Sequence, residues 1–208
     1  MLMTKVEWTR SGVPSKESII DATAAGMVSR HDDEYHEFVT EITFERAREF
    51  LEKMIRLGHD SVLEHIVFQF WVSISRVASH QLVRHRMASY TQKSHRKERI
   101  LTEEDFVIPD NLSEEDREEW IKDIRQQIAI YEKWLEKGYD ADIARRKLPQ
   151  ETRTDLVMTI NARSLRNFFK LRAEHVADFE IREMAQKMYH LIKKEQLDFL
   201  FYDIGIEN

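Results

Sequence analysis

The chain has 208 residues, of which 42% are hydrophobic and 34% charged, and its formal net charge is −6. This length suits one well-buried domain and is short for two, and the negative charge argues against a surface that binds nucleic acid as a whole. Cysteine is absent, which excludes disulfides, thiolate metal sites and cysteine nucleophiles. No apolar run is long enough to cross a membrane, and the N-terminus lacks the apolar core of a signal peptide, so we expect a cytoplasmic protein.

Hydrophobic periodicity predicts two helices and a strand in the first part of the chain. Residues 16–27 favour a helix that Ser15 caps at its N-terminus. Apolar residues recur at helical spacing from 44 to 57, and Gly58 is placed to end that helix. Between 66 and 75, apolar and polar residues alternate, which is typical of a strand.

The rest of the chain shows the same mixture. Further helices are predicted over 77–86, 114–137 (between Ser113 and Gly138), 141–148, 162–172 and about 177–202, and a second strand over 152–160. Helices dominate and the few strands form a small sheet. We therefore expect one α+β domain covering residues 1–208, with an antiparallel-rich sheet flanked by long helices.

The segment from Arg84 to Arg96 is the most basic part of this acidic chain. It holds three arginines, two histidines, a lysine and two serines in 13 residues, and no acidic residue follows until Glu98. Forked guanidinium groups beside small hydroxyl donors suit a bound phosphate or carboxylate. A solvated helix face would instead mix Lys with Glu, so we interpret the segment as an anion-binding site, with a plain basic surface patch as the alternative.

A second group lies between a predicted helix and a predicted strand. His59, Asp60, Glu64 and His65 place two histidines and two carboxylates within seven residues. Such residues can be metal ligands. The alternative is a helix end at which histidines complement the negative end of the dipole.

A third group lies on the helix predicted after the second strand. Arg163 and Asn167 are four residues apart and share one face. Arg172 follows Arg163 by nine residues and, at about 100° per residue, points nearly the opposite way. Two polar faces at different angles predict two ligands, whereas ordinary exposed helix charges are the alternative.

Taken together, these segments resemble the flavin-dependent thymidylate synthases. The family's hallmark is Arg-His-Arg, two residues, Ser, four residues, Ser, one residue and Arg, and every fixed position is filled here by Arg84, His85, Arg86, Ser89, Ser94 and Arg96. Other family blocks occur in the same order, namely Gly58-His59 with Glu64-His65, Gln81, Arg145 before Leu148-Pro149, and Asn161-Ala162-Arg163-Ser164 through Arg172. The resemblance spans roughly residues 24–181. The chain departs from the common pattern at Thr91, Gln92, His95, Lys97 and Val176, where His175 comes one residue early.

The resemblance implies a methyltransferase of nucleotide biosynthesis that converts dUMP to dTMP. It implies FAD as cofactor, NADPH as reductant, methylenetetrahydrofolate as carbon donor, and a homotetramer whose active sites combine several subunits. Neither nucleic acid nor a membrane is implied as a partner. The missing cysteines fit this reading, because a hydride from the reduced flavin replaces the thiolate attack used by the unrelated cysteine-dependent synthase.

Carried over residue by residue, the resemblance assigns three sets of residues. The cofactor set, in the flavin or folate region, comprises Ser29, His59, Ser61, Glu64, Arg84, His85, Arg86, Asn161, Arg163 and Asn167. The dUMP set comprises Gln81, Arg84, Ser94, His95, Arg96, Arg145 and Arg172, and the catalytic set Arg84, Arg172 and His59. Guanidinium groups would clamp the phosphate and stabilise negative charge developing on the uracil ring. Ser94 is interpreted as a hydroxyl donor to phosphate, with a nucleophile activated by His85 or His95 as the alternative.

Two other functions remain open at this point. His31-Asp32 and His59-Asp60 are shared with histidine–aspartate phosphohydrolases, so a metal-dependent nucleotide phosphohydrolase using His31, His59, Asp60 and Glu64 is one alternative. The other is a catalytically degenerate member of the same fold that binds nucleotides or RNA through residues 84–99.

Overall fold

A four-stranded antiparallel sheet forms the centre of the molecule. The structure is a computed structural model that describes residues 4–28, 35–96, 100 and 102–206. The strands are β1 (Lys5–Trp8), β2 (Val67–Ser75), β3 (Ala88–Gln92) and β4 (Arg153–Asn161). Their order across the sheet is β1-β2-β4-β3, and every neighbouring pair is antiparallel.

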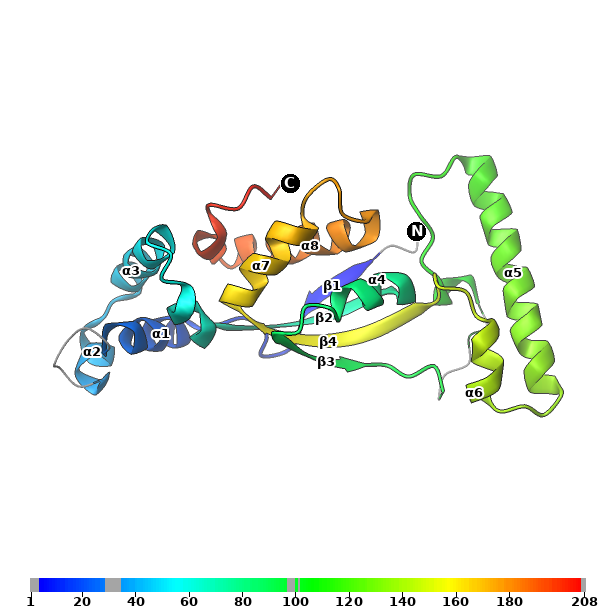
Figure 1. Cartoon of the computed structure of the whole chain (residues 1–208), viewed down its shortest axis with the longest axis horizontal. Helices are drawn as coiled ribbons and strands as arrows, with labels where there is room; N and C mark the ends of the chain where they lie inside the picture. Colours follow the sequence, from blue (N-terminus) through cyan, green and yellow to red (C-terminus); the bar gives the residue numbers. More distant parts are fainter. Residues whose placement is uncertain (1–3, 29–34, 97–99, 101, 207–208) are drawn as a thin grey trace.

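The helices of the described residues lie over one face of the sheet and at its two ends (Figure 1). They are α1 (Lys16–Val28), α2 (Tyr35–Glu41), α3 (Phe44–Arg56), α4 (Arg76–Leu82), α5 (Glu114–Glu136), α6 (Ala141–Ala144), α7 (Ala162–Arg172) and α8 (Phe179–Lys194). Helices α4, α7 and α8 lie over the sheet, α1 to α3 gather at one end, and α5 and α6 form the other end. The expected α+β class is confirmed.

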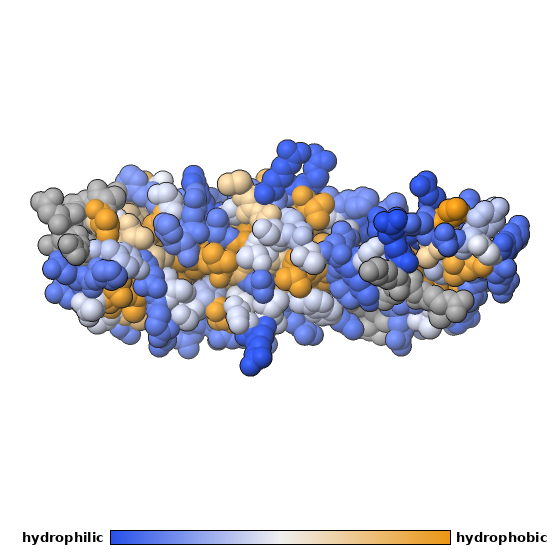
Figure 2. All heavy atoms as spheres, turned by 90° about the horizontal axis from the view of Figure 1, so that it is seen from below, coloured by the Kyte–Doolittle hydropathy of each residue, from blue (hydrophilic) through white to orange (hydrophobic). Residues whose placement is uncertain are grey.

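The alternating side chains of β2 and β4 define the main core. Phe68, Phe70 and Val72 of β2 and Leu156 and Met158 of β4 are buried. The residues between them, such as Trp71, are only partly buried within one chain. One face of the sheet is therefore covered by helices while the other is half-open, as antiparallel sheets allow. Seen from below, the elongated molecule shows apolar side chains along its middle (Figure 2).

A smaller second core lies under α5. It is formed by Ile100, Phe106, Ile108, Ile124, Ile128, Tyr131 and Ala144. Arg153, at the start of β4, links the two cores, because its guanidinium donates to the backbone carbonyls of Glu104 (3.2 Å) and Phe106 (3.4 Å). The α5–α6 end is thus fixed to the sheet by backbone acceptors as well as by packing.

Most predicted elements and caps are confirmed. The hydroxyl oxygens of Ser15 and Ser113 accept backbone N–H groups in the first turns of α1 and α5. Gly58 and Gly138 follow α3 and α5 with φ of 71° and 83°, the left-handed region in which glycine commonly ends a helix. Both predicted strands form, with bounds shifted by one residue.

Three predicted helices are wrong in extent, and three elements were not predicted. The helix expected over 141–148 is α-helical only over Ala141–Ala144 and continues as a 3-10 turn over Arg145–Lys147. The helix expected over 77–86 ends at Leu82, and the unpredicted strand β3 begins at Ala88 after a turn. The helix expected over 177–202 runs only from Phe179 to Lys194, and a 3-10 turn follows at Asp198–Phe201. Strand β1 and helix α2 were also missed, because neither is long enough for its periodicity to stand out. No helix within the described ranges is both long and apolar enough to span a membrane.

The end of α8 provides a stability test. Gln196 adopts φ 58°, and the N–H groups of Gln196 and Leu197 bond to the carbonyls of Lys193 (3.0 Å) and Ile192 (3.1 Å), the pattern that glycine usually completes. Since a left-handed conformation is strained for a residue with a Cβ, we expect Gln196→Gly to raise the free energy of unfolding by about 0.5–1 kcal/mol. Chemical denaturation measures this. The control is Glu195→Gly, at φ −86°, which should be destabilising; a loss of stability in both variants would contradict the prediction.

Candidate active site

Strand register brings two distant charged residues together. Val67, at the start of β2, pairs with Asn161, at the end of β4. The 3-10 helix η1 (Asp60–His65) directly precedes β2, and α7 directly follows β4. Glu64 on η1 therefore meets Arg163 on α7, and the two form an ion pair. The Asn161 side chain accepts the N–H of Ser164 at 2.8 Å, which caps α7 and fixes its first turn.

A tyrosine on β3 holds the Arg84-His85-Arg86 turn in place. The Tyr90 hydroxyl lies 2.9 Å from the carbonyl oxygen of Leu82 and 3.0 Å from that of His85, and its hydrogen is shared between them. Burial raises the pKa of Tyr90 to about 12, so the hydroxyl remains a donor at physiological pH. The basic motif is thus a turn between α4 and β3, fixed by its own downstream strand.

His85 and Arg172 are in direct contact. The Nε of Arg172 donates to Nε2 of His85 at 3.1 Å, and Nη1 donates to Oε1 of Gln81 at 3.4 Å. Burial, and secondly the charge of Arg172, lower the pKa of His85 to about 4. The imidazole is therefore neutral at pH 7, with its proton on Nδ1. The ring also packs edge-on against Phe168, with the centroids 4.9 Å apart.

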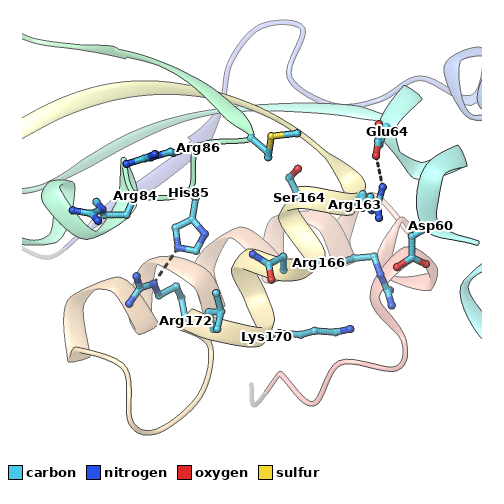
Figure 3. Close-up of a pocket in the computed structure, with 13 residues that line it drawn as sticks. Asp60, Glu64, Arg84, His85, Arg86, Arg163, Ser164, Arg166, Lys170 and Arg172 are labelled. Atoms are coloured by element: carbon cyan, nitrogen blue, oxygen red, sulfur yellow. Dashed lines mark hydrogen bonds and ion pairs between the residues drawn. The ribbon is translucent and has the colours of Figure 1, made fainter. Parts of the chain in front are cut away.

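The Arg84-His85-Arg86 turn, Arg163 and Arg172 line a cavity of about 710 Å³ (Figure 3). Its walls are formed by Asp60, Glu64, Arg84, His85, Arg86, Met87, Arg163, Ser164, Arg166, Asn167, Lys170, Leu171 and Arg172. Six of these are Arg or Lys and two are carboxylates, so the cavity carries an excess of positive charge in a chain whose net charge is −6. A volume of this size accommodates a nucleotide-sized ligand.

Arg163 and Arg172 lie at opposite ends of the cavity. They are nine residues apart on α7, roughly 13 Å at about 1.5 Å per residue, and in Figure 3 Arg163 lies beside Glu64 while Arg172 lies beside His85. The expectation that they occupy different faces therefore needs correction, since both side chains border one cavity. What separates them is mainly distance along the helix.

Several residues assigned to the cofactor set do not line this cavity in a single chain. His59 and Ser61 are exposed at the start of η1, and the side chain of Asn161 is engaged in capping α7. Ser29 lies outside the described residues. Glu64, Arg84, His85, Arg86, Arg163 and Asn167 of that set, with Arg172 of the dUMP set, are brought together as expected.

Two charged cavity residues were missed by sequence reasoning. Lys170 follows Arg163 by seven residues, close to two full helical turns, so its shared face with Arg163 and Asn167 was a usable signal. Arg166 is buried and donates to the carbonyl of Leu200 (2.6 Å) and to Asp203 (2.7 Å). No local signal identifies it, because these partners lie more than 30 residues away.

Four of the residues assigned to dUMP, namely Ser94, His95, Arg96 and Arg145, gather beyond the far end of β3, next to α6. Nε of Arg96 pairs with Oδ1 of Asp142 at 2.5 Å and Nη2 with Oδ2, while Arg145 reaches the same carboxylate at 3.2 Å. The Ser94 hydroxyl oxygen accepts the N–H of Arg96. A cavity of about 280 Å³ beside Arg145 is also lined by Arg76 and Arg146.

His95 differs from its neighbours in this group. Its side chain is 2% exposed, and Nε2 donates to the backbone carbonyl of Arg153 at 2.7 Å. In the single chain its ring therefore anchors the Ser94–Arg96 segment to β4 and also lines the cavity beside Arg145, so its assignment to the dUMP set stays a prediction.

Metal ligation, the basis of the phosphohydrolase alternative, finds no support in the geometry. Within the described part of the chain, no three His, Asp or Glu side chains are grouped so that they could hold a metal ion. Glu64 is instead paired with Arg163. His31, the first residue of that hypothesis, lies outside the described residues.

The cation-rich cavity has the charge and the size to suit a large anionic ligand. The family model described as "Thymidylate synthase complementing protein" matches residues 12–196. The flavin-dependent thymidylate synthase of Pyrococcus abyssi is 40% identical over 182 residues, covering 84% of this chain and 74% of that protein. That of Saccharolobus solfataricus is 40% identical over 191 residues, covering 91% and 71%.

The chain therefore belongs to the flavin-dependent thymidylate synthase family, and the predicted family and enzyme class are confirmed. Its fold is also that of a UMP/dUMP methylase, PolB from Streptomyces cacaoi, solved with 5-Br dUMP. The TM-score is 0.78 at 22% sequence identity, with 97% of this chain and 96% of that chain covered.

The His85–Arg172 contact predicts an unusual titration. Since burial is the main cause of the low pKa, the His85 ring should stay neutral down to about pH 4, and in Arg172→Ala its pKa should rise only part of the way towards 6.5. The unfolded chain binds a proton here below pH 6.5, so this residue removes stability as the pH falls from 6.5 to 4. Ring NMR titration measures the pKa directly; a value near 6.5 in the wild-type protein would contradict the geometry.

Proposed function

We propose that this chain catalyses the reductive methylation of dUMP to dTMP, with methylenetetrahydrofolate as carbon donor and NADPH-reduced FAD as hydride source. The observation that carries the proposal is the cation-rich cavity lined by His85 and Arg172 at one end and by Arg163 at the other, within a family defined by flavin dependence. The site residues and the assembly described below are part of this proposal.

The larger cavity suits FAD. Its excess of guanidinium and ammonium groups matches the negative charge of a dinucleotide's diphosphate, and its volume suits part of so large a ligand. Arg84, His85, Arg86, Arg163 and Asn167 are the residues that would hold it, with Glu64 orienting Arg163. His59, Ser61 and Ser29 would contribute from outside the single-chain cavity, and Asn161 by fixing α7. When bound, FAD supplies hydride transfer, which this cysteine-free chain cannot perform with its own side chains.

Arg172 is placed to act on the pyrimidine. The neutral His85 and Gln81 both accept hydrogen bonds from its guanidinium, so the charged group is held in one orientation. A fixed cation beside a uracil carbonyl stabilises negative charge that develops on the ring, without reorganisation during the reaction. Arg172 and Arg84 are the catalytic residues in this scheme, together with His59 near the flavin.

Ser94, Arg96 and Arg145 would hold the dUMP phosphate, and this requires more than one chain. The five residues of β3, at about 3.4 Å each, separate this group from the Arg84–His85 turn by roughly 17 Å. If both groups contact one dUMP, they belong to different subunits. The half-open face of the sheet and the exposed cavity residues Met87 (73%) and Leu171 (54%) offer surface for such contacts. A homotetramer satisfies these requirements.

We also place the enzyme in the cytoplasm, acting on free nucleotides without nucleic acid. Nine basic side chains line two separate cavities, and the chain as a whole carries a net charge of −6. Free dUMP and folate are small enough to enter such cavities.

Substitutions at Arg163 and Arg172 should affect the binding of different ligands, the cofactor and the substrate respectively. Arg172→Ala should weaken dUMP binding roughly tenfold or more while FAD stays bound, because a charge-assisted hydrogen-bond donor to the nucleotide is lost. Arg163→Ala should instead lower FAD occupancy. The visible absorption spectrum reports FAD, its bleaching by NADPH with and without dUMP reports coupling, and calorimetry reports dUMP. Loss of FAD in Arg172→Ala, with dUMP binding retained, would reverse the assignment.

Subunit complementation tests the shared site. Arg96→Ala and Arg172→Ala should each be inactive alone. Co-expressed with different tags and purified as mixed oligomers, they should recover activity in about a quarter of the sites, because random mixing pairs intact Arg96 with intact Arg172 across an interface at that frequency. Sedimentation should give the mass of a tetramer. Mixed tetramers that remain inactive would show that both arginines act within one chain.

A further inference from the structure

Asp142 occupies a position in which two guanidinium groups converge. It lies on α6, and both of its oxygens pair with the Nε–Nη2 edge of Arg96, while Arg145 reaches Oδ1 at 3.2 Å. A bidentate guanidinium with a second guanidinium at its side is the arrangement that binds a phosphate group. The carboxylate therefore stands where two phosphate oxygens would be held.

The two anions differ in charge. A carboxylate carries one negative charge, whereas a phosphomonoester carries about 1.5 to 2 at pH 7. The Arg96 hydrogen bond lowers the pKa of Asp142, so this carboxylate is ionised throughout the neutral range. Arg76 and Arg146 line the adjoining cavity with Arg145, which leaves the surroundings positive even with Asp142 present. A dianion can therefore compete for the Arg96 edge.

The ion pair is also accessible to exchange. The side chains of Arg96, Asp142 and Arg145 are 61%, 39% and 35% exposed, so water replaces the carboxylate on the guanidinium at little cost. Neither Arg96 nor Asp142 is buried in a way that would make separation expensive.

We propose that Asp142 is a specificity-determining residue for the nucleotide, an internal counter-anion that holds Arg96 and Arg145 until the phosphomonoester of the substrate displaces it. This rests on the proposed function of Arg96 and Arg145 as phosphate ligands. Singly charged anions and the unphosphorylated nucleoside do not displace Asp142 efficiently, so the site selects the monophosphate ester. The contact lowers the affinity for dUMP in exchange for that selectivity.

The experiment is dUMP titration of the FAD-loaded enzyme by calorimetry at low ionic strength, with inorganic phosphate as a second titrant. In Asp142→Asn the shape is kept and the competing charge removed, so dUMP and phosphate should both bind roughly two- to fivefold more tightly. The matched control is Asp140→Asn, which makes the same change of net charge two residues earlier. Asp140 precedes α6 without capping it through its side chain, and its variant should bind dUMP as the wild type does.

Four outcomes are possible, and each supports or overturns the proposal. Tighter binding in Asp142→Asn, with Asp140→Asn unchanged, supports the counter-anion. Weaker or unchanged binding in Asp142→Asn, while Arg96→Ala still weakens dUMP, overturns it and makes Asp142 at most a positioning group. Arg96→Ala that binds dUMP as tightly as wild type shows that the proposed phosphate site itself is wrong, and the inference falls with it. An equal gain in both Asn variants also overturns it, because net charge alone would then explain the effect.

Discussion

The residue-by-residue pairing of β2 with β4 is the constraint on which the rest of the molecule depends. Nine residues of each strand are in register from Val67–Asn161 to Ser75–Arg153. At one end this register sets η1 beside α7, which produces the Glu64–Arg163 pair. At the other end, the N–H of Ser75 donates to buried Glu180 of α8 at 2.6 Å. A slip of one residue would turn the apolar face of either strand towards solvent. It would also break the Glu64–Arg163 ion pair and the Ser75–Glu180 hydrogen bond.

Charge is distributed unevenly over this frame. The chain is acidic overall, yet six cationic side chains surround one cavity and further arginines surround Asp142. Such concentrations of like charge oppose folding unless anions or hydrogen-bond acceptors are near. The structure supplies internal acceptors, including Glu64, neutral His85 and Asp142. Under the proposed function, anionic ligands would neutralise the remaining positive charge.

The absence of cysteine gives this arrangement its chemical meaning. A chain with no thiolate cannot activate a pyrimidine by sulfur attack. Under the proposed function, its side chains would therefore bind, orient and stabilise charge, and the hydride would come from a flavin. His85 illustrates this division. Its low pKa makes it an acceptor that orients Arg172 at neutral pH, a role that requires no proton transfer by the enzyme.

The sequence by itself determined the α+β class, the two long strands, most helices with their caps, and the family, because these depend on local periodicity and on a motif with fixed spacing. Tertiary structure alone decided which functional residues meet. The Arg84–Arg96 motif reads as one site, but β3 runs through it and carries Arg84 and Arg96 to opposite ends of a strand. His95 turns inward to a backbone carbonyl, and Arg166 pairs with Asp203 from the distant C-terminal segment. Local sequence cannot specify such contacts, because they arise from strand register and from packing between residues far apart in the chain.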